Sequence, residues 1–237
     1  MDLRRSLKEA LKAGGYELCR ARPRRADFLG SRLVDTVLDV GANVGQFGRT
    51  LRREGFRGRI VSFEPTAECF AALRDVMEAD GNWTGFNVGL SGRDGTATIN
   101  VGADTAFSSL HPVRPAALRF DPLSAPVRTE EIRLARLDGF DATIAGDRLF
   151  LKVDTQGHER AVLEGAGALL DRVAGVQLEL PVSALYDGVW TLEEALGFMR
   201  GLGFVPALFT PVNAHKDDPL AVLEFDCVFR RLDPFLD

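Results

Sequence analysis

The chain has 237 residues, of which 46% are hydrophobic, and a formal net charge of −5 at pH 7. This size and balance are typical of one globular domain with room for a small appendage, and no apolar stretch approaches the roughly 20 residues that cross a bilayer. The negative charge argues against general nucleic-acid binding.

The N-terminal segment, residues 1–32, is predicted to be a basic helical extension. It holds nine Lys/Arg against four Asp/Glu, and Leu3, Leu7 and Leu11 fall on one face of a helix. Two interpretations are open: a helix that covers the domain with a solvated basic face, or one that contacts an anionic substrate or a membrane surface peripherally. Charges interrupt its apolar pattern, so it does not have the character of a secretory signal.

From residue 34 onward, strand and helix patterns alternate. VDTVLDV (34–40) and RIVSFEP (59–65) are continuous apolar runs, as expected for strands that are buried on both faces. A helix is predicted over residues 46–54, another follows the second strand, and TGFNVGL (84–90) is predicted to be a third strand.

The alternation stops after residue 90. SGRDGTATINV predicts a hairpin that turns at Asp94–Gly95, and residues 102–130 contain four prolines with little periodicity. A segment of this length in a compact domain is typically a lid or a binding loop. We therefore predict an inserted hairpin and lid at about residues 91–130.

The second half of the chain returns to the alternating pattern. DRLFLKVD (147–154) and VQLEL (176–180) are predicted strands, Thr191 and Glu194 form a capping box for a later helix, and the last two strands are expected to pair antiparallel. The order predicts an α/β fold over residues 33–237, with a Rossmann-like, doubly wound sheet that is mostly parallel and has an antiparallel C-terminal strand. Ligands of such sheets bind beyond the carboxyl ends of the strands.

Polar and flexible residues gather at those strand ends. A turn with two glycines, Gly41 and Gly45, follows the first strand. Glu64 ends the second strand and Asn87 lies near the end of the third. A carboxylate about twenty residues after such a turn typically accepts hydrogen bonds from two ribose hydroxyls. The sequence therefore predicts a ligand that contains a ribose.

Two ribose-containing cofactors compete for this turn. A dinucleotide would require glycines where the chain has Asn43 and Gln46, and Asp39 would repel its diphosphate. S-adenosylmethionine has no phosphate, and its sulfonium and ammonium cations favour a nearby carboxylate. S-adenosylmethionine is therefore preferred, and an NAD(P)-dependent Rossmann oxidoreductase is the alternative.

Several motifs also resemble a known family, the FkbM-type methyltransferases, in order and spacing over about residues 34–230. They are DVGANVGQF (39–47), FEP (63–65), NVGLSGRDG (87–95), LKVDTQGHERAVLEGA (151–166) and LELPVSALYDG (178–188). The resemblance implies a class I, S-adenosylmethionine-dependent methyltransferase that acts on hydroxyls of sugars, glycolipids or natural products. It implies contacts of the methionine end with residues 39–45, of the ribose with Glu64, and of the adenine with Asn87 and Val88. The cofactor-binding residues predicted in this way are Asp39, Gly41, Ala42, Asn43, Gly45, Phe47, Glu64, Pro65, Asn87 and Val88.

Three side chains are the candidates for catalysis. Methyl transfer from a sulfonium is an in-line displacement, and a hydroxyl acceptor must lose its proton as it attacks. His158 has a suitable ordinary pKa for a base at neutral pH, although it could instead cap a helix. Asp154, at the end of a central strand, either orients the acceptor or acts as the base. Glu179, at the end of the next strand, lines the acceptor pocket or makes a structural hydrogen bond.

A divalent metal is disfavoured but not excluded. The family's frequent Asp-x-Glu-Gly stands here as Asp154-Thr155-Gln156-Gly157, so an amide replaces one possible carboxylate ligand. Hard cations prefer carboxylate oxygens. We predict no metal site, although Asp154, His158 and Glu179 could still assemble one.

The remaining expectations concern partners and location. Cys19, Cys69 and Cys227 are odd in number and form no CxxC pair, which predicts neither a disulfide framework nor a zinc site and is typical of the reducing cytoplasm. The expected partner is a small-molecule or glycan acceptor, not a nucleic acid. A non-catalytic cofactor-binding module is a further hypothesis, and the sequence carries no signal for the oligomeric state or for the identity of the acceptor.

Overall fold

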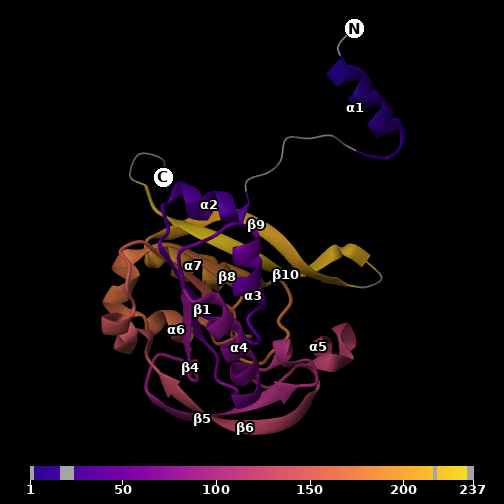
Figure 1. Ribbon diagram of the computed structural model, residues 1–237. Coiled ribbons are helices and arrows are strands. Elements are labelled where there is room, and N and C mark those ends of the chain that lie inside the picture. Colours follow the sequence, from indigo (N-terminus) through magenta and orange to yellow (C-terminus); the bar gives the residue numbers. More distant parts are fainter. Residues whose placement is uncertain (1–2, 17–23, 216–217, 234–237) are drawn as a thin grey trace.

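A seven-stranded sheet forms the centre of the molecule, with the strand order β3-β2-β1-β7-β8-β10-β9 (Figure 1). The computed structural model describes residues 3–16, 24–215 and 218–233. The strands of the central sheet are β1 (Thr36–Val40), β2 (Arg59–Phe63), β3 (Trp83–Phe86), β7 (Leu149–Val153), β8 (Val173–Pro181), β9 (Phe204–His215) and β10 (Asp218–Arg231). A second, three-stranded sheet contains β4 (Gly89–Leu90), β5 (Gly95–Gly102) and β6 (Pro126–Ala135).

The helices fill the connections between these strands. The α-helices are α1 (Leu3–Ala13), α2 (Arg25–Ser31), α3 (Gln46–Arg53), α4 (Ala67–Asp80), α5 (Pro115–Phe120), α6 (Glu159–Glu164) and α7 (Leu192–Gly201). The short 3-10 helices are η1 (Thr105–Phe107), η2 (Pro122–Ser124), η3 (Leu137–Thr143) and η4 (Gly167–Arg172). The capping box predicted at Thr191 and Glu194 is confirmed at the start of α7.

The predicted fold class is confirmed. Strands β1, β2, β3, β7 and β8 pair in parallel, whereas β10 pairs antiparallel with both β8 and β9. The central strands β1 and β7 are buried along their whole length, as their continuous apolar sequences require. The carboxyl ends of β1, β2 and β7 therefore meet at one edge of the sheet.

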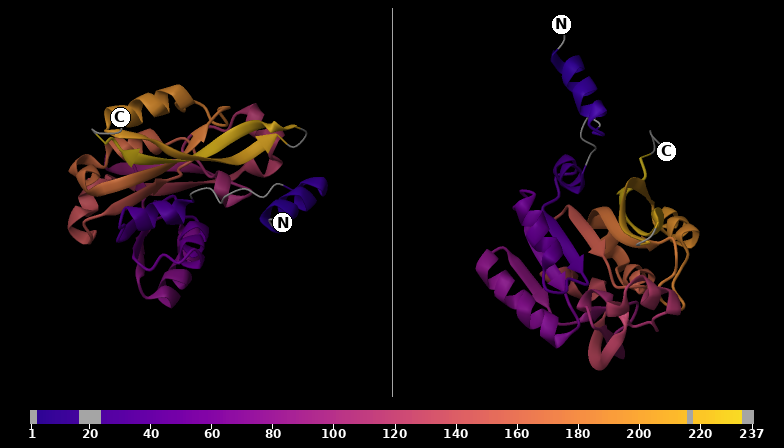
Figure 2. Two further views of the ribbon diagram at one scale, coloured as in Figure 1. Left: turned by 90° about the horizontal axis from the view of Figure 1, so that it is seen from above. Right: turned by 90° about the vertical axis from the view of Figure 1, so that its right-hand side faces the viewer.

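Helices cover both faces of the sheet. Figure 2 shows α3 and α4 on one face and α7 on the opposite face. Along β1, Val37 packs into the apolar cluster beneath α3 and α4, and Leu38 packs into the cluster beneath α6 and α7. The alternation places Asp39 on the α3 side, beside its register partner Lys152 of β7.

The inserted segment differs from the predicted hairpin. The structure forms no hairpin at Asp94–Gly95, because β4 and β5 do not pair with each other; both pair with β6, β4 in parallel and β5 antiparallel. The true hairpin partner, β6, lies beyond the proline-containing segment that includes η1 and α5. Residues 126–135 are mostly exposed and carry charged side chains on both faces of the strand, so their strand pattern is weak in the sequence.

The N-terminal extension divides into two parts in the structure. In α1, which is drawn apart from the sheet in Figure 1, Leu7 is 53% exposed. In α2, Leu29 is buried in the cluster beneath α3 and α4, and Phe28 packs against Phe150 of β7. Cys19 and the middle of the predicted extension, residues 17–23, lie outside the described residues. Cys69 and Cys227 are buried free thiols.

Candidate functional site

The turn after β1 brings backbone, rather than side chains, against the neighbouring strand end. Gly41 has φ +73°, and a Cβ there would clash with the main-chain oxygen of Asp154. Gly45 has φ +85°, and a Cβ there would press on Leu73 and Trp83. Glycine is therefore required at both positions for close packing as well as for its backbone conformation.

Glu64 follows β2 directly and is held in one orientation. Its side chain is buried, with the residue only 5% exposed. Oε2 accepts a hydrogen bond from the Asn43 amide at 2.8 Å, and Oε1 accepts from the amide and the hydroxyl of Thr66 at 2.9 and 2.6 Å. Burial raises the pKa of Glu64, and these hydrogen bonds oppose that rise. The carboxylate is thus preorganised by three donors before any ligand arrives.

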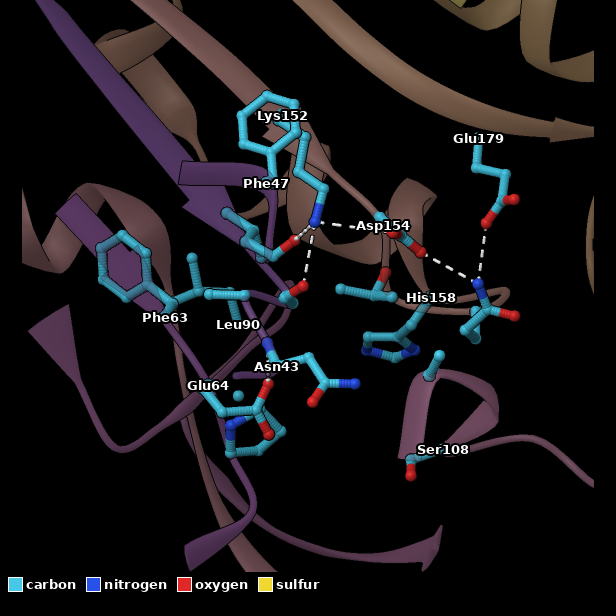
Figure 3. A pocket seen from close by; sticks show the side chains of 18 of the residues that line it. Asn43, Phe47, Phe63, Glu64, Leu90, Ser108, Lys152, Asp154, His158 and Glu179 are labelled. Carbon is cyan, nitrogen blue, oxygen red and sulfur yellow. Dashed lines mark hydrogen bonds and ion pairs between the residues drawn. The ribbon is translucent and has the colours of Figure 1, made fainter. Parts of the chain in front are cut away.

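A cavity of about 320 Å³ lies over the strand ends. Figure 3 shows Glu64 and Asn43 on one side of it and Glu179 on the other, with Asp154 and His158 between them. Beyond Glu64 the lining is apolar, from Pro65, Val88, Leu90, Ile132 and Leu134. One end of the cavity thus has the Glu64 carboxylate beside apolar side chains, and the other end has the polar side chains of Asp154, His158 and Glu179.

A buried lysine stands beneath the glycine turn. Lys152 Nζ lies 3.1 Å from Asp39 Oδ1 and 3.5 Å from Asp154 Oδ2, and it donates to the carbonyl of Gly41 at 2.9 Å. Burial lowers the pKa of Lys152, but the charges of Asp39 and Asp154 raise it by more, so it stays protonated. The ammonium connects β1, the glycine turn and the end of β7, and it offsets part of the negative charge of Asp39 and Asp154.

Gln156 bridges the acids on the polar side. Its residue has φ +51°, a left-handed conformation uncommon for a side chain of this size. Its amide nitrogen donates to Asp154 Oδ1 at 2.9 Å and to Glu179 Oε2 at 2.7 Å, and its oxygen accepts from the Tyr186 hydroxyl at 2.8 Å. All three groups of this arrangement are therefore oriented by one amide.

The acids next to Gln156 share a buried, negative environment. Burial and the charges of Asp154, Glu224 and Asp226 raise the pKa of Glu179 well above its ordinary range. Burial likewise raises the pKa of Glu224 to about 7. Within residues 3–16, 24–215 and 218–233, no group of three or more His, Cys, Asp or Glu side chains has the arrangement of a metal site.

His158 lines the cavity beside Asp154. Its Nε2 is 3.0 Å from Ser91 Oγ, and its Nδ1 is 3.5 Å from His111 Nε2. Burial, and secondarily the charge of His111, lower the pKa of His158, so its ring is neutral at pH 7. The neighbouring Glu159 accepts hydrogen bonds from the amides of Thr155 and Gly157, which fixes the turn.

The structure brings most of the predicted residues to one cavity and leaves three outside its lining. Those that line it are Gly41, Ala42, Asn43, Phe47, Glu64, Pro65, Val88, Asp154, His158 and Glu179. Asp39 instead lies below the turn against Lys152, and Gly45 packs on Trp83. The Asn87 amide donates to the carbonyls of Glu64 and Pro65 at 2.9 Å each, which holds the chain that carries the carboxylate.

Lys152, Gln156 and Arg25 are among the cavity residues that were not predicted from the sequence. Lys152 and Gln156 stand inside the quoted motif LKVDTQGHE, but a lone lysine in an apolar strand and an amide beside an acid give no signal of their contacts. Arg25 lines the cavity from α2, far from the motifs in the sequence. Arg25 is one of nine Lys/Arg in residues 1–32, and nothing in the sequence distinguishes it from the others.

Comparison with known sequences identifies a family. Residues 39–206 match the family model described as the methyltransferase FkbM domain. None of the curated proteins matches the chain.

Comparison with solved structures identifies the fold. The methyltransferase domain of bacterial CtHen1-C is 13% identical, with a TM-score of 0.50 over 88% of this chain and 95% of that one. An rRNA methylase from Streptococcus thermophilus is 15% identical, with a TM-score of 0.48 over 90% and 100%. A methyltransferase FkbM from Methylobacillus flagellatus KT is 14% identical, with a TM-score of 0.49 over 83% of this chain and 43% of that one. The chain thus spans less than half the length of that protein, and the shared fold is that of class I methyltransferases.

Proposed function

The chain belongs to the FkbM methyltransferase family, and from this premise we propose that it transfers the methyl group of S-adenosylmethionine to a hydroxyl oxygen of a sugar, a glycolipid or another natural product. Dependence on S-adenosylmethionine follows from the family. The acceptor class and the roles of individual residues are the parts that we propose.

The observation that carries the proposal is the order of groups along the cavity. Glu64 and the apolar residues Val88 and Leu90 suit an adenosine, since a carboxylate can accept from both ribose hydroxyls while the purine is buried. The glycine turn and Asp154 come next, where the cationic methionine end would lie. The activated methyl group would then point toward the polar side with His158 and Glu179.

The residues on that polar side suit transfer to oxygen. A neutral His158 can accept the proton of a hydroxyl as it attacks the methyl carbon, which contributes typically about 10²–10⁴-fold. Asp154 and Glu179, fixed by Gln156, can accept hydrogen bonds from the acceptor and align it, and such positioning supplies up to roughly 7–11 kcal/mol. The sulfur leaves as a neutral thioether, so the leaving group needs little assistance.

The acceptor is proposed to be uncharged and not a nucleic acid. The fold alone does not decide this, because proteins of the same fold include an rRNA methylase. Asp154 lines the cavity beside the expected position of the methyl group, and its carboxylate would repel a phosphate backbone that approached there. A neutral polyol would find acceptors for its hydroxyls there.

Location and membrane contact belong to the proposal as well. We infer a cytoplasmic enzyme from its cysteines, and a role for α1 at anionic surfaces from its basic residues and exposed Leu7. Across the described residues, every helix is too short or too polar to cross a membrane.

A labelled-donor experiment tests the proposal. The protein is incubated with methyl-labelled S-adenosylmethionine and separate glycan, lipid, small-molecule and RNA fractions, with Asp154→Ala as the control. We expect label that depends on Asp154, in a product whose methyl ether survives alkaline hydrolysis. Label in RNA, or on nitrogen or a labile ester, would refute the proposed acceptor class. Calorimetry with NAD tests the alternative function. Binding of NAD without binding of S-adenosylmethionine would support an oxidoreductase.

A further inference from the structure

Two permanent cations line the described part of the cavity, Lys152 and Arg25, and they differ in how closely the protein's own groups hold them. Lys152 contacts Asp39 and Asp154 and donates to the carbonyls of Val40 and Gly41. Its charge is therefore balanced by the protein. A ligand anion would gain little from it.

Arg25 is held loosely by comparison. Its guanidinium lies over the ring of Phe47 at 4.5 Å, Nη1 donates to Gln177 at 3.3 Å, and Nη2 contacts Glu54 at 3.4–3.5 Å. Its Nε is buried and has no acceptor among the described residues. These distances are at the long end for charge-assisted hydrogen bonds, which are typically about 2.7–2.9 Å.

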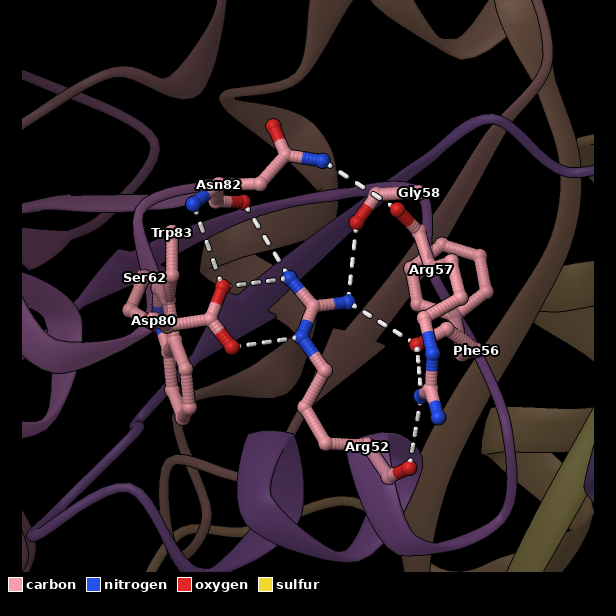
Figure 4. Close-up of polar contacts among 8 residues, drawn as sticks. All are labelled: Arg52, Phe56, Arg57, Gly58, Ser62, Asp80, Asn82 and Trp83. Atoms are coloured by element: carbon pink, nitrogen blue, oxygen red, sulfur yellow. Dashed lines mark hydrogen bonds and ion pairs between the residues drawn. The ribbon is translucent and has the colours of Figure 1, made fainter.

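Arg52, a second arginine, makes the set of short hydrogen bonds that Arg25 lacks. Figure 4 shows Arg52 forking onto Asp80, at 2.7 and 2.8 Å, while the same guanidinium also donates to three main-chain carbonyls around it. Arg52 is a structural clamp between α3 and the segment that follows α4. Arg25 lacks such an anchor and faces the cavity instead.

The position of Arg25 relates it to the methionine end of the cofactor. Phe47, the second residue of α3, lies between the two cations: its ring is 4.5 Å from the Arg25 guanidinium and 5.4 Å from Lys152 Nζ. Arg25 therefore lies along α3, between Phe47 in its first turn and Glu54 at its carboxyl end, and it lines the cavity together with residues 41–43 of the glycine turn.

The other charged side chains that line the cavity are acids. A free carboxylate would be repelled by Glu64 and Asp154, which suit the ribose and the cations of the ligand. Glu179 lines the cavity as well, but burial and the neighbouring acids raise its pKa. Asp226 lines the cavity too, but burial raises its pKa and so reduces its negative charge, while Arg25 opposes that rise. A carboxylate within the cavity is therefore best placed at Arg25.

We propose that Arg25 binds the carboxylate of the methionine moiety of S-adenosylmethionine. The inference rests on the proposed use of this donor. It extends the cofactor site to α2, outside the segment that matches the family model. Helix α2 then has a functional role in addition to packing Leu29 and Phe28 against the sheet.

The test compares two ligands that differ only in that carboxylate: S-adenosylmethionine and its decarboxylated form. Dissociation constants are measured by calorimetry for the wild type, Arg25→Gln and Arg25→Lys, with Arg52→Gln as the control. We expect Arg25→Gln to weaken binding of S-adenosylmethionine by roughly 10- to 100-fold, the range for a lost hydrogen bond to a charged group, and to leave the decarboxylated form within about twofold. Arg25→Lys should keep part of the preference.

Each other outcome has a distinct meaning. Equal losses for both ligands in Arg25→Gln would show that Arg25 only supports the fold, and this would overturn the inference. Unchanged binding of both ligands would overturn it as well. A wild type that binds neither ligand would refute the proposed function, and the inference with it. Arg52→Gln should lower the melting temperature without changing the ratio of the two dissociation constants.

Discussion

Replacing Gln156 by Glu tests the polar side of the site most directly. The two side chains have nearly the same shape, but the substitution turns the amide donor between Asp154 and Glu179 into a third carboxyl group. The hydrogen bonds at 2.9 and 2.7 Å cannot both survive. A protonated carboxyl has one O–H and can donate to only one of its two neighbours.

The cost can be worked out from these contacts. One lost hydrogen bond to a charged group costs about 1.5–3 kcal/mol. Keeping a glutamate with an ordinary pKa near 4.3 protonated at pH 7 costs up to about 3.7 kcal/mol, at 1.36 kcal/mol per pKa unit. The segment is half-buried, and water relieves part of both terms. We therefore expect the free energy of unfolding to fall by about 2–4 kcal/mol at pH 7.

The pH dependence gives the sign of the effect. The pKa of the new carboxyl is raised in the folded protein relative to the unfolded chain, so the folded state binds more protons between the two values. The variant should match the wild type most closely below about pH 4 and lose relative stability as the pH rises toward 7. Urea unfolding at several pH values measures this. Gln46→Glu, the same substitution at an exposed position of α3, is the matched control and should change stability by less than about 0.5 kcal/mol.

A metal ion should rescue the variant but not the wild type. Three carboxylates in place of two and an amide would offer Mn²⁺ or Ca²⁺ a set of oxygen ligands. We expect millimolar Mn²⁺ to restore part of the lost stability of Gln156→Glu. A variant as stable as the wild type at pH 8 without metal would refute the bridging role of Gln156.

Three further predictions address the other parts of the site. Glu64→Gln should weaken binding of S-adenosylmethionine by roughly 10- to 100-fold and lower the free energy of unfolding by about 1–3 kcal/mol, because an amide cannot accept from all three donors that converge on Glu64; calorimetry and urea unfolding measure the two effects, and an unchanged affinity would remove Glu64 from the ribose site. His158→Asn should lower the turnover number by about 10²–10⁴-fold with an unchanged cofactor affinity. The wild-type rate should fall as the pH drops through a pKa below 6.5, and a variant that keeps this acidic limb would show that another group is the base. Lys152→Met should cost about 3–5 kcal/mol because it leaves the buried Asp39 without its ion-pair partner, and adding Asp39→Leu should recover part of that loss; equal stability of the single and double variants would mean that the pair is not coupled.

The central strands were predictable because burial requires apolar residues, and a continuous apolar run is visible in the sequence. Residues 36–40 of the run VDTVLDV and the strand at 149–153 are buried on both faces, so most of their residues are apolar and the strand signal is continuous. Strand β6 was not predicted because it carries charged side chains on both faces and because its partner β5 lies more than twenty residues earlier. A hairpin turn such as Asp94–Gly95 indicates a reversal of the chain but does not determine which strand pairs with which.

Part of the candidate site could also be predicted from the sequence. Glu64 and the glycine turn follow from strand ends and spacing, because topology alone brings such positions together. The partners of Lys152 and Gln156 could not be read in this way, since each depends on side-chain directions across neighbouring strands. Asp39 shows the difference: its charge suggested a ligand contact, whereas the register of β1 with β7 pairs it with Lys152.

Polar contacts connect the inserted segment (residues 91–130) and Tyr186 to the turns on both sides of the cavity. The Thr105 hydroxyl of η1 donates to the Asn43 side chain at 3.1 Å, next to Glu64. Further along, Ser109 donates to the main-chain oxygen of Gln156 at 2.6 Å, and Tyr186 bonds both the Gln156 side chain and the carbonyl of Phe107. Asn43 and Gln156 are the two non-glycine residues of the site in left-handed backbone conformations, so the insert contacts the turns that orient Glu64 and the acids. We expect a cover fixed at these points to restrict the access of water to the cavity, which would strengthen the charge interactions within it.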